Sequence, residues 1–360
     1  MSITLESKLP LRIALVGQTF DESRTVQRAS AMQSLGISLK CIPTVLSGSN
    51  YETSPSFNKR IRYYLRIPSD PAKANSRVIE EVNKGVDILW LDAADMITFS
   101  TLQRAKELND KLVIIWYGED DMMNPRMRTR QIERALPLFD LWVTTKSFNA
   151  KPMEIPTLGA KKVLFVNNSC DPQLHRSIKV TEEERILFGG GISFIGSFEA
   201  PRAHSLLYLA KRGLNVRIWG NGWGSWVNRH PNLIVENRPI YNEDYVKAIS
   251  ASSINLCFLR KANRDLQTCR SIEIPSCSGF MLHERNSEIT NLYREAKEAV
   301  YFSSDEELFD MCSFWLNRDQ RSSIIGEAAK KRTIELGLSH KINIIRVINN
   351  ALSNYSDLVL

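Results

Sequence analysis

The chain has 360 residues, of which 43% are hydrophobic, 24% charged and 9% aromatic, which is typical of a folded globular protein and excludes disorder over most of the length. A chain of this length favours two domains. Lysine and arginine outnumber aspartate and glutamate by 47 to 40, and the net charge of +7 suits an anionic ligand or a membrane surface but is too dispersed to identify either. Nucleic acid is not favoured as a partner.

The cysteine pattern and the hydropathy limit the class of protein further. The six cysteines form no CxxC pair and no cluster with histidine, so we expect reduced thiols, no metal centre and a cytoplasmic protein. Residues 1–10 lack the apolar core of a signal peptide, and no run approaches the roughly 18 apolar residues of a membrane span.

The first half of the chain alternates short β-branched runs with amphipathic polar stretches. Strands are expected over 11–17, 37–42, 86–91, 111–117, 140–145 and 162–166, and a helix over 21–35 that ends at Gly36. This alternation predicts a parallel sheet covered by helices, which binds ligands at the carboxyl ends of its strands.

A second alternating series begins after the composition changes around residues 167–192, where three consecutive glycines start at Gly189. Its expected strands are 192–196, 214–220, 232–236, 253–258, 279–283 and 299–302, and the sequence from Ser304 onward has helical periodicity. The pattern predicts an α/β fold with two Rossmann-like domains facing a cleft: 1–170, a linker over 171–190, and 191–338, followed by a C-terminal helix over 339–360.

Two common nucleotide motifs are missing from this pattern. The first strand is followed by Gly17-Gln18-Thr19-Phe20 and not by GxGxxG, which argues against a dehydrogenase, and the turn Gly220-Asn221-Gly222-Trp223-Gly224 lacks the lysine of a phosphate loop. Gly17 has two interpretations: close approach of the backbone to donor phosphates or acceptor, or a strand-to-helix turn that needs glycine.

The segment 263–284 carries the most chemical information. A helix is expected to begin near Thr268, a residue type that caps helices, and free backbone N–H groups at such an end favour a phosphate. Arg270 would add a forked donor to the same anion, and Glu273, three residues further on, could accept hydrogen bonds from a ribose. The alternative is an ordinary arginine–glutamate surface pair.

A family resemblance starts from the same residues. The run Asp265-x-x-Thr268-x-Arg270-x-x-Glu273-Ile-Pro-x-x-x-Gly279-Phe-x-Leu282, followed by Glu288, 305–308, His340 and Arg346, resembles the C-terminal half of CgeB-like glycosyltransferases of the GT-B superfamily, with their group 1-like C-terminal domain. Residues 192–224 also resemble the opening of a GT-B donor domain.

The resemblance implies an acceptor domain first, a donor domain second, and a last helix that crosses back to the first domain. It implies a metal-independent hexosyltransferase with a UDP-sugar as donor and no further cofactor. The implied donor-binding residues include the diphosphate ligands Arg202 and Arg270 and the ribose ligand Glu273, with Gly17, Gly196, Asn237, Arg238, Ile240, Asp265 and Thr268 also lining the donor site. Asp265 stands where the larger GT-B group has a glutamate, so the stereochemistry is left open. Asp265 either approaches the sugar or diphosphate or caps the helix expected near Thr268.

Three acids form the candidate catalytic group. Glu119, Asp120 and Asp121 follow the strand expected over 111–117, and CgeB-like proteins often have an acidic pair at this place. A carboxylate among like charges has a raised pKa and could act as general base toward an acceptor hydroxyl. The alternatives are a helix cap and a partner for Arg126 or Arg128.

The acceptor is left open among a glycan, a lipid, a protein and a small molecule. The basic, aromatic stretch 58–68 is either a solvated surface or a patch for an anionic acceptor or for peripheral membrane contact. Two rival functions remain: a nucleotide-sugar epimerase and a non-catalytic nucleotide-binding scaffold.

Overall fold

The computed structural model describes residues 11–53 and 56–353, apart from the side chains at positions 59 and 63. The predictions for residues 1–10 and for the end of the C-terminal helix, 354–360, lie outside the described residues. The chain divides into two compact units: unit 1 runs to Asn167 and resumes at His340, and unit 2 is Asn168–Ser339.

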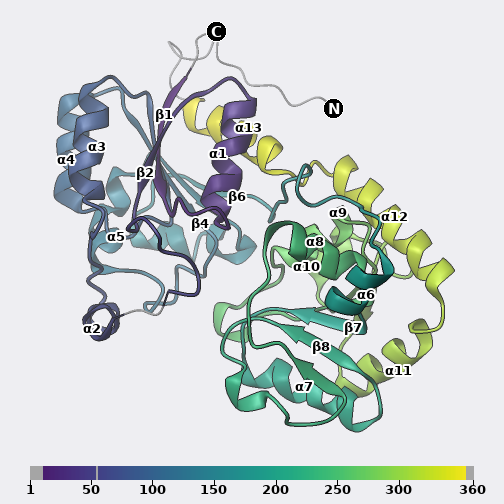
Figure 1. Cartoon of the computed structure of the whole chain (residues 1–360). Coiled ribbons are helices and arrows are strands. Elements are labelled where there is room, and N and C mark those ends of the chain that lie inside the picture. The colour runs from purple at the N-terminus through teal and green to yellow at the C-terminus, as the bar shows by residue number, and fades with distance from the viewer. Residues whose placement is uncertain (1–10, 54–55, 354–360) are drawn as a thin grey trace. The chain divides into compact units, whose positions relative to one another are not determined.

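Unit 1 is built on a six-stranded parallel sheet with the order β2-β1-β3-β4-β5-β6 (Figure 1). Its strands are β1 (Arg12–Gly17), β2 (Ser38–Pro43), β3 (Ile88–Asp92), β4 (Val113–Gly118), β5 (Leu141–Thr144) and β6 (Val163–Phe165). Each strand was expected within two residues of these bounds. The order reverses between β1 and β3, and such a reversal opens a crevice at the carboxyl ends of the two strands.

Helices cover both faces of this sheet because its side chains alternate in direction. Ala14 and Val16 pack with the helices of one face, whereas Ile13 and Leu15 pack with those of the other. The first face is covered by α3 (Ala74–Asn83), α4 (Phe99–Leu108) and α5 (Arg130–Ala135), and the second by α1 (Arg24–Ser34) and α13 (His340–Leu352). Unit 1 also contains α2 (Phe57–Tyr64) and the 3-10 turns η1 (Leu136–Leu138), η2 (Ser147–Ala150) and η3 (Ile155–Leu158).

Helix α13 belongs to the core of unit 1 although it comes from the far end of the sequence. Ile344, Val347 and Ile348 are buried in the same cluster as the strands β1, β3 and β4, and α13 lies against α1 (Figure 1). Unit 1 therefore cannot bury this face of its sheet without the last helix.

Unit 2 contains a second six-stranded parallel sheet, with the order β12-β11-β10-β7-β8-β9. Its strands are β7 (Gly190–Ile195), β8 (Val216–Trp219), β9 (Leu233–Val235), β10 (Ser252–Cys257), β11 (Met281–Glu284) and β12 (Val300–Phe302). This is the strand order of the Rossmann fold, and its reversal lies between β7 and β10. The predicted fold class, two Rossmann-like domains of parallel strands and helices, is confirmed.

The helices of unit 2 also form two layers. One face of the sheet packs against α7 (Ala200–Lys211) and α11 (Asp305–Trp315). The other face packs against α8 (Asn242–Ser250), α9 (Arg270–Ser276), α10 (Ser287–Leu292) and α12 (Asp319–Glu335). Two 3-10 turns, η4 (Gly224–Trp226) and η5 (Lys261–Asn263), lie in the connections.

The predicted linker over 171–190 contains structure of its own. Helix α6 (Glu182–Phe188) begins with a reciprocal cap between Thr181 and Glu184. Gly190 already belongs to β7, and a Cβ on Gly189 would lie 2.5 Å from the backbone oxygens of Ala251 and Arg185. The glycine run is therefore a site of close packing at the start of a strand and not a flexible connection.

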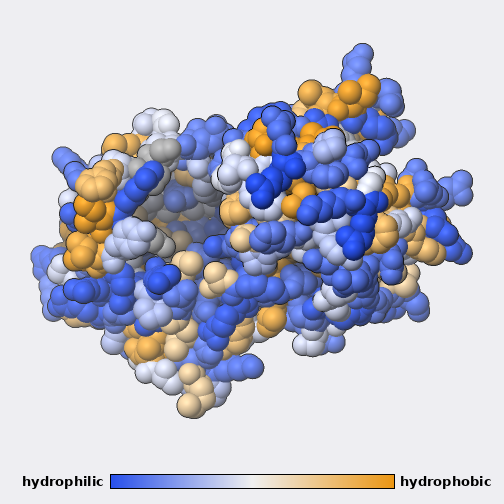
Figure 2. All heavy atoms as spheres, turned by 90° about the horizontal axis from the view of Figure 1, so that it is seen from below, coloured by the Kyte–Doolittle hydropathy of each residue, from blue (hydrophilic) through white to orange (hydrophobic). Residues whose placement is uncertain are grey.

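On the face drawn in Figure 2, hydrophilic residues cover most of the surface and hydrophobic residues form smaller groups between them. None of the helices within the described residues combines the length and the apolar character that crossing a membrane requires.

Candidate functional site

The crevice of unit 1 begins at Gly17, where β1 ends next to Asp92 at the end of β3. A Cβ on Gly17 would lie 2.7 Å from the side chain of Thr25 and 3.2 Å from Cβ of Asp92. Thr25 is buried on α1. The strand-to-helix turn thus needs glycine for close packing, which favours the structural interpretation of Gly17.

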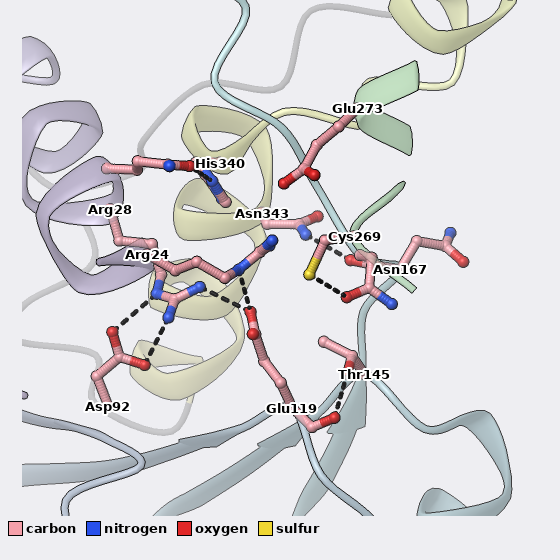
Figure 3. A network of polar contacts seen from close by, with 12 residues as sticks. Arg24, Arg28, Asp92, Glu119, Thr145, Asn167, Cys269, Glu273, His340 and Asn343 are labelled. Atoms are coloured by element: carbon pink, nitrogen blue, oxygen red, sulfur yellow. Dashed lines mark hydrogen bonds and ion pairs between the residues drawn. The ribbon is translucent and has the colours of Figure 1, made fainter. Parts of the chain in front are cut away.

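A buried ion-pair network occupies this carboxyl edge (Figure 3). Arg28 donates from Nε to Asp92 Oδ2 at 2.9 Å and from Nη2 to Oδ1 at 2.8 Å. Its Nη1 donates to Glu119 Oε1 at 2.9 Å, and Arg24 Nε donates to the same oxygen at 3.0 Å. Because α1 carries both arginines one turn apart, the two guanidinium groups converge on one carboxylate.

This network corrects the expectation of a raised pKa at Glu119. Burial alone would raise the pKa of that carboxyl, but Arg24 and Arg28 outweigh burial and lower it to about 2. Burial by itself would lower the pKa of Arg28. The negative charges of Asp92 and Glu119 outweigh burial and raise that pKa. A carboxylate with so low a pKa is a weak base, and Glu119 serves here as an ion-pair partner.

The two aspartates that follow have different surroundings. Asp121 is buried, and its Oδ1 accepts hydrogen bonds from Asn149 Nδ2 at 2.9 Å and from the backbone N–H of Met123 at 3.1 Å. Asp120 is exposed at the end of β4. Of the three acids, Asp120 is thus the most accessible from solvent, with Glu119 partly exposed and Asp121 buried.

Sequence reasoning missed Arg24, Arg28 and Asp92. The sequence did carry two signals. Arg24 and Arg28 lie four residues apart after the helix cap Ser23, and Asp92 ends an apolar strand. Sequence reasoning did not connect them because strand order, which is a tertiary property, brings them together. Neither Arg126 nor Arg128 is the partner of Glu119; Arg128 Nε instead donates to Glu133 at 3.1 Å.

A pocket of about 550 Å³ opens beside the same edge of unit 1. Its walls come from the connections that follow β1 and β2 and from the start of α3: Thr19, Phe20, Pro43, Leu46, Lys73 and Arg77 are among them. The rings of Phe20 and Pro43 therefore stand near two exposed cations, Lys73 and Arg77.

The crevice of unit 2 lies between β7 and β10, and the turn that follows β8 needs glycine at position 220. Gly220 has φ 149°, and a Cβ there would lie 2.1 Å from the backbone oxygen of Gly196. Trp223 Nε1 donates to the same oxygen at 2.8 Å. The Gly-rich turn after β8 is therefore packed onto Gly196, at the place where α7 begins.

Three arginines of unit 2 gather beyond this turn. Arg202, in the first turn of α7, and Arg260, after β10, share the carboxylate of Glu199, with Arg202 Nη2 to Oε2 at 2.6 Å and Arg260 Nε to Oε1 at 3.0 Å. Burial lowers the pKa of Arg202, Glu199 opposes this shift, and the charges of Arg270 and Arg260 add to it. Positive charge in this cluster therefore exceeds what Glu199 neutralises.

Two guanidinium nitrogens of the cluster are buried without a hydrogen-bond partner, namely Nε of Arg202 and Nε of Arg270. A buried charged donor without a partner costs free energy unless a ligand accepts from it. The charge of Arg270 contributes to the lowered pKa of Arg202, so the two predicted diphosphate residues belong to one electrostatic cluster.

Glu273 points inward on α9 and is buried. Tyr245 on α8 donates its hydroxyl to Glu273 Oε2 at 2.8 Å, and His175 Nε2 lies 3.8 Å from Oε1. Burial raises the pKa of Tyr245, and Glu273 adds to that shift. His175 Nδ1 accepts from the backbone N–H of Asp171 at 3.1 Å, which leaves Nε2 to face the carboxylate.

The start of α9 differs from its prediction. The helix begins at Arg270 with Cys269 at the cap position and no side-chain cap, so Thr268 does not cap it. Instead, Ser271 Oγ accepts from the backbone N–H of Thr268 at 2.9 Å and lies 2.8 Å from His283 Nε2. His283 Nδ1 lies 2.7 Å from the backbone oxygen of Glu284, which can only accept, so this nitrogen carries a proton.

The remaining predicted donor residues occupy loops around the same crevice. Asn237 has φ 48°, the guanidinium of Arg238 lies 4.8 Å from the ring centre of Trp219, and Ile240 is buried. Asp265 is buried and accepts from Asn263 Nδ2 at 2.7 Å. Within residues 11–53 and 56–353, no group of three or more histidine, cysteine, aspartate or glutamate residues is placed to hold a metal ion.

Comparison with known proteins now adds to this geometry. Residues 202–341 match the family model described as "Glycosyl transferase-like", a range that contains Arg202, Arg270 and Glu273. Comparison with curated proteins by sequence finds no significant match.

Three of the solved structures with a similar fold are a glycosyltransferase, HepE of Anabaena and a putative epimerase. A glycosyltransferase from Rickettsia africae is 12% identical with a TM-score of 0.65 over 96% of this chain and 100% of its own. HepE of Anabaena, in complex with UDP and glucose, is 12% identical with a TM-score of 0.60 over 95% and 100%. A putative UDP-N-acetylglucosamine 2-epimerase from Listeria monocytogenes is 10% identical with a TM-score of 0.58 over 96% and 97%.

The chain thus has the GT-B fold of the nucleotide-sugar glycosyltransferases, and its second unit carries the sequence features of a glycosyltransferase family. This agrees with the function predicted from the sequence.

Proposed function

We propose that this protein transfers a hexose from a UDP-sugar to an acceptor hydroxyl, with the donor bound by unit 2 and the acceptor by unit 1. The observation that carries the proposal is the pair of buried arginines with unpartnered Nε atoms, Arg202 and Arg270, inside the segment that matches the glycosyltransferase family. HepE, which shares the fold, was crystallised with UDP and with UDP-glucose.

The donor-binding roles are those that the family resemblance implies, and the surroundings of Arg202, Arg270 and Glu273 support them. Arg202 and Arg270 bind the diphosphate, and their charge balances the departing UDP without a metal ion. Glu273 accepts hydrogen bonds from the ribose hydroxyls, with Tyr245 holding one carboxylate oxygen in place. Asn237, Arg238 and Ile240 border the base, Gly196 lets the donor approach the backbone, and Asp265 and Thr268 complete the loop before α9.

In unit 1 we assign the base to Asp120. The carboxylate is exposed at the carboxyl edge of the sheet, where ligands of α/β proteins bind. Asp120 takes the proton from the acceptor hydroxyl as the oxygen attacks the anomeric carbon, and UDP leaves with the bond electrons. Arg24, Arg28 and Asp92 hold Glu119 and the β4 end in place beside it.

The sequence resemblance supports placing this chain among the CgeB-like glycosyltransferases. The six free cysteines support a reducing compartment such as the cytoplasm. The acceptor pocket is the 550 Å³ pocket at the start of α3.

The proposal is tested in two stages. A thermal-shift panel of nucleoside diphosphates and their sugars comes first, and we expect UDP and a UDP-sugar to raise the melting temperature because they bind only the folded protein. Release of UDP is then followed in the presence of candidate acceptors, with and without a chelator. A sugar that changes configuration without an acceptor would establish the epimerase, and stabilisation by none of the nucleotides would refute donor binding.

A further inference from the structure

Exposed hydrophobic side chains are concentrated in one segment of unit 1. Within the described residues, fifteen large hydrophobic side chains are exposed, and seven of them lie between positions 46 and 67: Leu46, Tyr51, Phe57, Ile61, Tyr64, Leu65 and Ile67. Single exposed apolar residues are normal on a protein surface, but a group of this size marks an interaction surface.

Helix α2 and the residue directly after it, Leu65, place four of these side chains on one side. Phe57, Ile61, Tyr64 and Leu65 follow the spacing of a single helical face, at i, i+4, i+7 and i+8. Phe57 is 76% exposed and Tyr64 is 83% exposed. A helix of a soluble domain normally buries such a stripe in the core, whereas in Figure 1 helix α2 stands away from α3 and α4, which cover the sheet.

The charges of the same segment have one sign. The sequence contains no acidic residue between Glu52 and Asp70, and it contains four basic ones there. Arg60 and Arg62 are exposed on α2 itself. An apolar stripe flanked by exposed arginines is complementary to a lipid bilayer with a negative surface, because the stripe enters the headgroup region while the arginines meet the phosphates.

The surface is attached to the rest of unit 1 through Arg66. This residue has φ 59°, and its Nε donates to the backbone oxygen of Arg128 at 2.8 Å. Its own backbone oxygen accepts from the N–H of Arg130 at 3.1 Å, and its guanidinium forms an ion pair with Glu133. At the N-terminal end of the exposed segment, the ring of Tyr51 packs edge-on against the ring of Phe20, with the ring centroids 4.5 Å apart.

We propose that the α2 face, defined as Phe57, Ile61, Tyr64 and Leu65 with Arg60 and Arg62, docks unit 1 onto an anionic phospholipid bilayer. The inference deepens the proposed function and rests on it in one respect: the acceptor pocket shares Leu46 with the exposed segment, so docking would bring that pocket to a lipid-borne acceptor.

Cosedimentation with vesicles tests the docking itself. The wild-type chain is mixed with phosphatidylcholine vesicles with and without phosphatidylglycerol, and we expect it to sediment with the anionic vesicles only. The variant F57S/I61S/Y64S/L65S should lose this binding. The variant R60E/R62E should bind on the order of 25-fold more weakly or worse, since each cation near the surface contributes about 1 kcal/mol.

Helix α12 of unit 2 supplies matched controls. Ile324 and Ile334 are each 69% exposed, and Arg321 and Lys331 are exposed on the same helix. I324S/I334S and R321E/K331E should sediment like the wild type. The proposal would be overturned if the α2 variants still bound the vesicles, or if the wild type bound neutral and anionic vesicles equally. It would also be overturned if the protein formed a dimer in solution that dissociates on α2 substitution.

UDP binding distinguishes this test from that of the proposed function. The α2 variants should keep the wild-type affinity for UDP and the wild-type melting temperature, because the α2 face has no part in unit 2. Loss of vesicle binding with intact UDP binding supports docking, whereas absence of UDP binding in every variant would refute the donor site and leave the docking result to stand on its own.

Discussion

Arg28 and Asp92 form a two-pronged buried ion pair, Nε to Oδ2 at 2.9 Å and Nη2 to Oδ1 at 2.8 Å, at the point where the strand order of unit 1 reverses. The pair ties the first helix to the end of β3. The pair also orients the third guanidinium nitrogen of Arg28, Nη1, toward Glu119, so that Arg28 holds both Asp92 and Glu119 in place.

Replacing Arg28 by alanine should destabilise the protein by about 3 to 5 kcal/mol, because it leaves Asp92 charged and buried without its partner. Urea unfolding followed by fluorescence measures the loss as a lower midpoint. Arg104→Ala, which removes a surface pair with Glu107, is the control and should leave the midpoint within error. A midpoint for Arg28→Ala equal to that of this control would contradict the role of the pair.

Glu119 should contribute stability that depends on pH. Its folded-state pKa of about 2 lies below the ordinary 4.5, so the contribution is complete above the ordinary pKa and disappears as the pH falls toward 2. Glu119→Gln should therefore be less stable than wild type at neutral pH, on the order of 2 kcal/mol given its partial exposure. The difference should shrink as the pH is lowered from 5 to about 2. A difference that stays constant with pH would show that Glu119 is not held by its arginines.

Ser271 should hold the loop before α9. Ser271→Ala leaves the backbone N–H of Thr268 and Nε2 of His283 without their common partner, which costs about 1 to 3 kcal/mol. Thermal unfolding compares it with Ser287→Ala, an exposed serine of the neighbouring helix α10. Equal melting temperatures for the two variants would mean that this chain of hydrogen bonds does not position the loop.

Asp120→Asn should lower kcat by roughly 100-fold or more while the KM for the donor stays unchanged, because the change removes the proposed base and no proposed donor contact. Asp110→Asn, another exposed acid of unit 1, is the control. A wild-type kcat in Asp120→Asn would show that another residue acts as the base. Asp121→Asn should act mainly on stability, since the Asp121 carboxylate is bonded to Asn149 and Met123.

The fold could be predicted from sequence because parallel strands buried on both faces leave continuous apolar runs such as Val113–Gly118. Periodicity also placed the helix that ends before Gly36. The start of α9 was predicted within two residues, but its cap was predicted wrongly, because Thr268 has the residue type of a cap whereas Ser271 accepts the hydrogen bond at this turn. A side chain that accepts from a residue before its own helix leaves no periodic signal.

Site chemistry was harder to predict than site position. The three acids after β4 were placed at the carboxyl edge correctly, but the pKa of Glu119 depends on Arg24 and Arg28, nearly a hundred positions earlier. Tyr245 was not singled out because it comes from another helix than Glu273. Local spacing shows which residue types share a helix face, and only the tertiary structure shows what faces them.

The central claim is that Arg270 and Glu273 bind the diphosphate and the ribose of a donor in unit 2. Isothermal titration of UDP and of uridine into the wild type, Arg270→Ala and Glu273→Gln tests it most directly, with Arg321→Ala as the control. Arg270→Ala should bind UDP roughly 10- to 100-fold more weakly than the wild type and should bind uridine with unchanged affinity. Glu273→Gln should lower the affinity for both UDP and uridine. Equal UDP affinity in the wild type and Arg270→Ala, or uridine binding that Glu273→Gln leaves unaltered, would contradict the account.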